Sequence, residues 1–160
     1  AGIQAWSEKY RYNIWRPVTA IQEGENDGNP LTAGDPAWQS LINNPNYPDY
    51  TSGANNISAA MLRTMALFFN RDRFDFEVTS NAANVAQRTR TYRKFSQAAQ
   101  EVVDARVLLG IHFRFADTAA RKQGEQVAIG KDVYVSLCRP HWEEEMGRVA
   151  AEDLVGFARE

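Results

Sequence analysis

Hydrophobic residues recur every three or four positions along most of this 160-residue chain, the spacing of a buried face on an α-helix. Pro17 lacks a backbone donor and disfavours helical geometry at Arg16, so the first helix should kink or break there. Gly124 and Gly130 should interrupt the fourth helix. Residues 70–90 alternate loosely and then become polar, which indicates a linker with one short extended piece. The predicted helices cover residues 3–21, 57–69, 91–109, 116–137 and 142–157.

The segment 22–53 is rich in glycine and proline, which predicts a long irregular loop. Asp35, which is followed by proline, favours a short helix through Ile42, with Trp38 and Leu41 facing the interior. A loop of this length inside a compact domain is often functional. We therefore expect an ordered loop that serves a site.

Composition excludes several classes of protein. The 18 aromatic residues (4 Trp, 6 Tyr and 8 Phe) argue for a folded core, and the length fits a single domain covering residues 1–160. The net charge of −2, with acids and bases interspersed, argues against a nucleic-acid partner, and no apolar run predicts a membrane span. Cys138 is the single cysteine, so an internal disulfide and a cysteine-based metal site are excluded. His141 reads as a surface residue, and localisation cannot be read from the sequence.

Two pairs of residues suggest an anion site. Arg106 and His112 flank Gly110, and both face one pocket if the helix loosens at that glycine. A guanidinium and an imidazole at a helix end suit a tetrahedral oxyanion, although a core helix with one exposed arginine and one hydrogen-bonded histidine explains the same residues. Lys9 and Arg16 are two helical turns apart and share a face. Their aromatic neighbours predict partial burial and a need for an anion, whereas a solvated face is the simpler alternative.

A third feature is the Ser52-Gly53 turn, which runs into an apolar helical pattern. Such a turn at a helix N-terminus exposes backbone N–H groups and the positive end of the helix dipole, which attract anions. A well-capped helix with no ligand is the alternative. The candidate N-caps are Ser52, Asn55 and Asn56.

Taken in order, these motifs form a three-part signature: Lys9-x6-Arg16-Pro17, Ser52-Gly53 and Arg106-x5-His112. The chain resembles the superfamily of type-2 phosphatidic acid phosphatases and vanadium-dependent haloperoxidases over residues 1–128. The phrases EKYRYNIWRPVTAI, GNPLTAGDPAW, YPDYTSG, RKFSQAAQE and GIHFRFAD resemble its bacterial haloperoxidase-like branch.

The resemblance implies an all-α helical bundle that holds vanadate, or phosphate in the same site. It implies that the cations neutralise the equatorial oxygens of the oxyanion and that the Ser52 hydroxyl and Gly53 N–H donate hydrogen bonds to it. His112 would ligate vanadium in a haloperoxidase or attack phosphorus in a phosphatase. The cations implied for oxyanion binding are Lys9, Arg16 and Arg106.

The sequence departs from the family pattern at three places. Ala54 stands where the family has its acid/base histidine, and a methyl group transfers no proton. The family often has an aspartate four residues after the last histidine to orient its ring, whereas here Ala116 precedes Asp117, which we take as the candidate orienting and catalytic acid. The chain also begins at the first motif, so we expect either a piece of a longer protein or a homo-oligomer that covers the exposed apolar faces.

These observations predict the oxyanion-binding domain of a vanadium-dependent haloperoxidase-like enzyme, with peroxide-driven halide oxidation as its chemistry. The alternatives are an acid phosphatase, a non-catalytic oxyanion-binding domain, and an interaction module with a vestigial site. Asn55, Asn56 or a water would have to stand in for the missing histidine if the domain is active.

Overall fold

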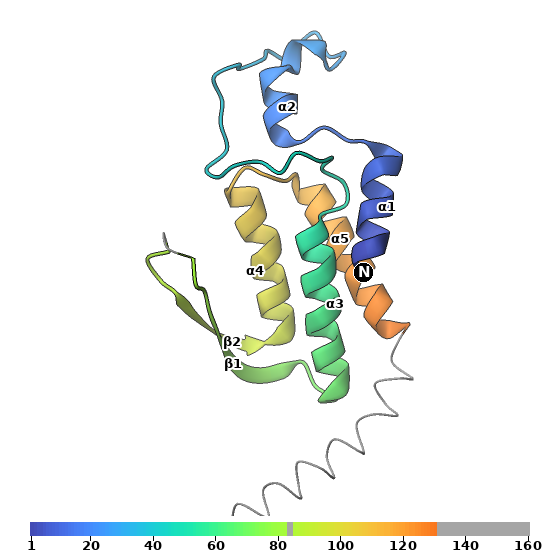
Figure 1. The fold of residues 1–160 in the computed structure, drawn as a ribbon, viewed down its shortest axis with the longest axis vertical. Helices are drawn as coiled ribbons and strands as arrows, with labels where there is room; N and C mark the ends of the chain where they lie inside the picture. The colour runs from blue at the N-terminus through green and yellow to red at the C-terminus, as the bar shows by residue number, and fades with distance from the viewer. Residues whose placement is uncertain (83–84, 131–160) are drawn as a thin grey trace, which may run out of the picture.

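The computed structural model describes residues 1–82 and 85–130. Within them the protein is mostly helical, with a two-stranded hairpin. Figure 1 shows α3, α4 and α5 side by side, with α1 alongside and the hairpin next to α4. The elements are α1 (Gly2–Tyr12), α2 (Pro17–Gln22), the 3₁₀ turn η1 (Gly24–Asn26), α3 (Gly53–Phe68), β1 (Arg73–Thr79), β2 (Thr89–Lys94), α4 (Phe95–Leu108) and α5 (Arg114–Ile129).

Helices α3 and α5 form the most extensive helix–helix contact, and their backbones approach closely at Gly124. A Cβ on that residue would lie 2.2 Å from the Asn56 carbonyl oxygen and 3.0 Å from the Ala60 nitrogen. The predicted interruption at Gly124 is therefore wrong, because α5 runs through it. The glycine serves packing between helices rather than a break within one.

The hairpin corrects the expected linker at residues 70–90 and the expected start of the next helix at Thr91. Strand β1 pairs antiparallel with β2, with Phe76 opposite Tyr92. The rings of Phe74 and Phe76 lie 5.5 and 5.2 Å from the ring of Phe95. The alternating aromatic residues thus close one end of the core, whose buried members are Leu62, Ala66, Tyr92, Phe95, Ala98 and Ala99.

The segment between η1 and α3 crosses the end of the bundle where α3 begins, α4 ends and α5 begins (Figure 1). The short helix predicted to run from Asp35 through Ile42 is absent, because the Asp35 side chain instead accepts the Ala37 N–H in a turn. Leu41 is 78% exposed, so its predicted inward orientation is also wrong. Its backbone N–H donates to the Leu109 carbonyl, which ties the loop to the end of α4.

No helix in residues 1–82 or 85–130 is long and apolar enough to cross a membrane. The predicted helix 142–157, the end of the predicted helix 116–137, Cys138 and His141 lie outside the described residues.

Candidate oxyanion site

Lys9 and Arg16 come together through a turn rather than on one helix face. Asn13 adopts a left-handed conformation (φ 48°) and ends α1, and Arg16 is the N-cap residue of α2. Pro17 follows as the first helical residue, a position that its fixed φ favours. The predicted break at Arg16 is confirmed. Both cations are buried, with Lys9 0% and Arg16 5% exposed.

Backbone carbonyls, rather than carboxylates, hold both cations. Lys9 Nζ donates to the Pro48 and Asp49 carbonyls (2.8 and 2.9 Å). Arg16 donates from Nε to the Tyr47 carbonyl (2.6 Å) and from Nη1 to the Ile111 carbonyl (2.8 Å). Carbonyls orient a cation without cancelling its charge, so the pair keeps its attraction for an anion.

The electrostatic cost of this arrangement appears in the pKa of Lys9, which is lowered from 10.5 to about 8. Burial is the main cause, and the charges of Arg16 and Arg106 lower it further. The pKa of Arg16 is lowered as well, again mainly by burial. A bound anion would reverse these effects.

Helix α3 begins at Gly53, four residues before the predicted helix 57–69, and Ser52 is the one of the three candidate N-caps that caps it. Ser52 is the N-cap, and its hydroxyl accepts the Asn55 N–H at 3.5 Å. A Cβ on Gly53 would lie 2.4 Å from the Trp6 ring, so glycine is the residue that lets α1 cover this helix start. The N–H of Gly53 belongs to the first turn, where no carbonyl within the helix can accept it.

His112 follows the end of α4 as expected from Gly110. Helix α4 ends at Leu108, and Gly110 takes φ +74°, a left-handed conformation typical of a residue just past a helix C-terminus. The chain reverses there and buries the imidazole, which is 2% exposed. Arg106 lies in the last turn of α4. Its charge lowers the pKa of both Lys9 and His112, which places the three groups in one electrostatic field.

Asp49 is the acid that contacts His112, and our sequence reasoning missed its role. It is fully buried, and its Oδ1 pairs with His112 Nδ1. Its Oδ2 accepts the Phe113 N–H at 3.4 Å. The YPDYTSG phrase contains this aspartate three residues before Ser52, but nothing in the sequence joins it to a histidine 63 positions away. The pKa of His112 is lowered, mainly by burial, while Asp49 acts in the opposite direction.

Asp117, the predicted orienting acid, has a different partner. It lies in the first turn of α5 and accepts a hydrogen bond from Asn55 Nδ2 at 2.6 Å. Burial raises its pKa, while hydrogen bonding from Ser52 and the charge of His112 act to lower it. Asp49 rather than Asp117 contacts the His112 ring, so the expectation that Asp117 orients it is corrected: the Asp117 carboxyl is hydrogen-bonded to Asn55 of α3 instead.

Three side-chain nitrogens at this place are buried and have no hydrogen-bond partner among the described residues. They are Arg16 Nη2, from the first motif, and Arg106 Nε and His112 Nε2, from the third. Buried polar atoms of this kind normally find a partner. Their chemistry, two guanidinium nitrogens and an imidazole nitrogen, fits a tetrahedral oxyanion such as vanadate or phosphate.

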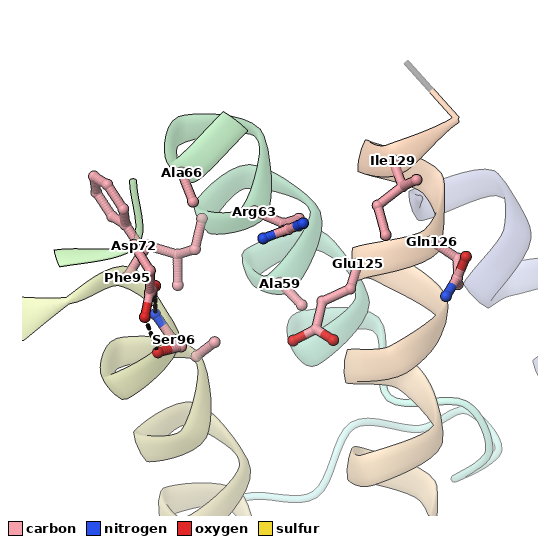
Figure 2. A pocket seen from close by; sticks show the side chains of 11 residues that line it. Ala59, Arg63, Ala66, Asp72, Phe95, Ser96, Glu125, Gln126 and Ile129 are labelled. Carbon is pink, nitrogen blue, oxygen red and sulfur yellow. Dashed lines mark hydrogen bonds between the residues drawn. The ribbon is translucent and has the colours of Figure 1, made fainter. Parts of the chain in front are cut away.

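One pocket lies beside Arg16, and another lies away from these three nitrogens. An open pocket of about 460 Å³ includes Arg16 and Tyr47 in its wall. A second hollow, of about 350 Å³, lies between α3, α4 and α5, and none of the predicted site residues lines it. Figure 2 shows its alanine-rich floor, with Arg63 and Glu125 projecting from α3 and α5. Of the predicted site residues, Arg16 alone lines the first pocket.

Comparison with known proteins identifies relatives of this chain. Vanadium chloroperoxidase of Curvularia inaequalis is 26% identical over an alignment 178 positions long, which covers 84% of this chain and 28% of that protein. A crystal structure of a bacterial vanadium-dependent iodoperoxidase is 31% identical, with a TM-score of 0.65, and the match covers 79% of this chain and 28% of that one. Holo-type bacterial vanadium-dependent chloroperoxidase has the same fold, with a TM-score of 0.67 at 22% identity, over 84% of this chain and 33% of that one.

A shorter match of 44 residues is 70% identical to a thymidine kinase of Mesorhizobium japonicum, and it covers 28% of this chain and 22% of that protein. It covers too little of either chain to inform the fold. The chain thus spans about a third or less of the length of the proteins it matches.

The sequence model of the family described as the VCPO second helical-bundle domain matches residues 1–139. The chain belongs to this family of vanadium-haloperoxidase helical-bundle domains.

Proposed function

We propose that this domain binds vanadate and forms the cofactor-binding part of an enzyme that oxidises halide with peroxide. The observation that carries the proposal is the set of three buried, unpartnered side-chain nitrogens on Arg16, Arg106 and His112, within the described part of the chain. They come from the first and third motifs, and none has a protein partner among the described residues. The two guanidinium nitrogens are preorganised donors of the kind that an anionic cofactor requires, and the imidazole nitrogen is a free ligand atom.

Each residue has a defined task in this proposal. Lys9, Arg16 and Arg106 would neutralise the charge of the oxyanion, and the Ser52 hydroxyl and the Gly53 N–H would donate hydrogen bonds to it. His112 Nε2, with its lone pair free, would ligate vanadium. The chemistry that vanadate would supply there is Lewis-acid activation of peroxide. The open pocket lined by Arg16 and Tyr47 is the route that we propose for small reactants.

The site lacks the acid/base histidine that the family uses to transfer protons. Ala54 has no proton to give, and the side-chain amides of its neighbours are already engaged: Asn55 Nδ2 donates to Asp117 and Asn56 Nδ2 donates to Gln123. These contacts make both asparagines poor substitutes for a histidine. A non-catalytic oxyanion-binding domain is therefore the second candidate function, and Ala54 is the observation that favours it.

Calorimetric titration with orthovanadate tests the binding proposal. Arg106→Ala and His112→Ala should each weaken binding at least tenfold, because a charged hydrogen bond contributes about 1.5–3 kcal/mol. Arg63→Ala is the matched control, since that arginine is exposed and lines the other hollow. Absence of saturable binding to the parent protein, or equal binding by all variants, would contradict the proposal. A parallel titration with phosphate measures the preference between the two anions.

The Ala54→His variant separates the two candidate functions. If only the relay is missing, halide oxidation should rise by about 10²–10⁴-fold in the variant, at unchanged vanadate affinity. An inactive variant that still binds vanadate would favour the non-catalytic alternative. Ala60→His, on the same helix, controls for the effect of adding an imidazole.

A further inference from the structure

The segment from Tyr47 to Asp49 contacts both ends of the candidate site. Its three consecutive carbonyls accept from the two cations of the first motif: Tyr47 from Arg16, and Pro48 and Asp49 from Lys9. The Tyr47 ring lies beneath both charges, 5.0 Å from Lys9 Nζ and 4.8 Å from Arg16 Cζ. The segment therefore fixes the direction of both cations.

The side chain of Asp49 reaches the third motif. One carboxylate oxygen pairs with His112 Nδ1, and the other accepts the N–H of Phe113 at 3.4 Å. The backbone N–H of Asp49 donates to the Ile14 carbonyl at 3.0 Å, which anchors the residue to the turn between α1 and α2. A fully buried aspartate whose carboxylate is held at two points and whose backbone is held at a third has little freedom to reorient. It can therefore dictate the orientation of the ring it contacts.

The choice of ring nitrogen has a chemical consequence. A neutral imidazole that donates its Nδ1–H to a carboxylate keeps its lone pair on Nε2. In His112 that second nitrogen is buried and has no partner in the described structure. The carboxylate thus selects the tautomer in which the free nitrogen is a ligand or nucleophile rather than a donor.

We propose that Asp49 is the positioning residue of this site: it holds His112 in the Nδ1–H tautomer, with Nε2 presented to the oxyanion. Through the carbonyls of Tyr47, Pro48 and Asp49 the same segment aligns Lys9 and Arg16. The role of Nε2 toward vanadate rests on the proposed function, whereas the tautomer does not. Asp49 in this role replaces Asp117, which is committed to Asn55.

Long-range ¹H–¹⁵N correlation spectroscopy of the imidazole at one neutral pH tests the proposal without any ligand. The chain has two histidines, so a His141→Gln background leaves the His112 signals alone. We expect a single Nδ1–H tautomer in the parent protein. In Asp49→Asn the amide cannot accept from both Nδ1 and the Phe113 N–H in the same way, so the Nε2–H tautomer should appear. An Nε2–H ring in the parent protein, or an unchanged ring in the variant, would overturn the proposal.

Orthovanadate titration of the same proteins supplies the functional readout. Asp49→Asn should lose about 10–100-fold in affinity, the usual effect of removing a partner behind a ligating histidine. Asp35→Asn, an exposed aspartate of the same loop, should bind as the parent does. If the parent does not bind vanadate but its tautomer depends on Asp49, the positioning role stands and the proposed function fails. Unchanged affinity in Asp49→Asn would overturn the link between the two.

Discussion

At the scale of single residues, the site is defined by buried cations whose partners are carbonyl oxygens. A carboxylate partner would neutralise Lys9 and Arg16, whereas a carbonyl leaves their charge available to a ligand. Burial without a carboxylate partner destabilises the protonated form of Lys9, whose pKa falls to about 8. Binding of an anion and the protonation of this lysine are therefore thermodynamically linked.

This linkage predicts the pH dependence of oxyanion binding. Between about pH 8 and pH 10.5 the unfolded chain holds a proton on Lys9 that the ligand-free folded protein has released, so the stability contributed by this group rises with pH in that window. A bound anion favours the protonated form, so its affinity should fall as pH rises above about 8. Titrations of orthovanadate across this range check the slope.

Lys9→Met is the matched variant for that experiment. It should bind more weakly at neutral pH and lose the additional slope above about pH 8. Because both proteins meet the same anion at each pH, the comparison removes the contribution from ionisation of vanadate itself. Parallel pH profiles for the two proteins would contradict the assignment of the slope to Lys9.

The sequence singled out Lys9, Arg16, Ser52 and His112, and the structure buries all four. These residues lie in short motifs with local signals, whereas the residues that contact them were missed. Asp49 contacts His112 across 63 positions, and that pairing depends on how the loop crosses the bundle. Residues with tertiary partners of this kind have no local signal.

At the scale of elements, local signals predicted where helices begin, whereas elements that depend on tertiary contacts were predicted poorly. The starts of α2 and α3 follow from Pro17 and Ser52, because an N-terminal proline and a capping hydroxyl act locally. The loose alternation in residues 70–90 predicted one short extended piece but not its pairing, because β2 lies in a stretch that was predicted as polar linker and helix, and the aromatic residues of β1 pack against Phe95 of a later helix. Asp72 then caps α4 from outside, since its carboxylate accepts from the N–H and hydroxyl of Ser96.

The closest backbone contact between elements gives a stability prediction. In Gly124→Ala the new methyl group would lie 2.2 Å from the Asn56 carbonyl oxygen, so α5 must move away from α3. We expect a loss of about 1–3 kcal/mol, as for other overpacked interiors. Urea unfolding measures it, and Gly130→Ala is the control because no atom lies closer than 3.6 Å to a Cβ there. Equal stability of the two variants would show that the helices tolerate a wider spacing.

At the scale of the whole molecule, the three motifs of the candidate site all lie in one domain that spans about 28% of vanadium chloroperoxidase. That domain leaves apolar side chains on its surface along α3. Ile57, Met61 and Met65 follow one another at four-residue spacing and are 51%, 59% and 39% exposed. Residues so spaced lie on one helix face. The first turn of α1 continues this surface, since a Cβ on Gly2 would lie 3.8 Å from Ile57 Cδ1.

Contiguous apolar patches of this kind on a monomer usually mark an interface. We therefore expect the 160-residue chain to self-associate through α3 at micromolar concentrations, as measured by sedimentation velocity. Met61→Lys should shift the distribution toward monomer, because it places a charge in the centre of the patch. Leu31→Lys tests whether any added charge has this effect, since Leu31 is 92% exposed in the loop before α3. A monomeric parent protein, or an equal response to both substitutions, would mean that the α3 face does not drive association.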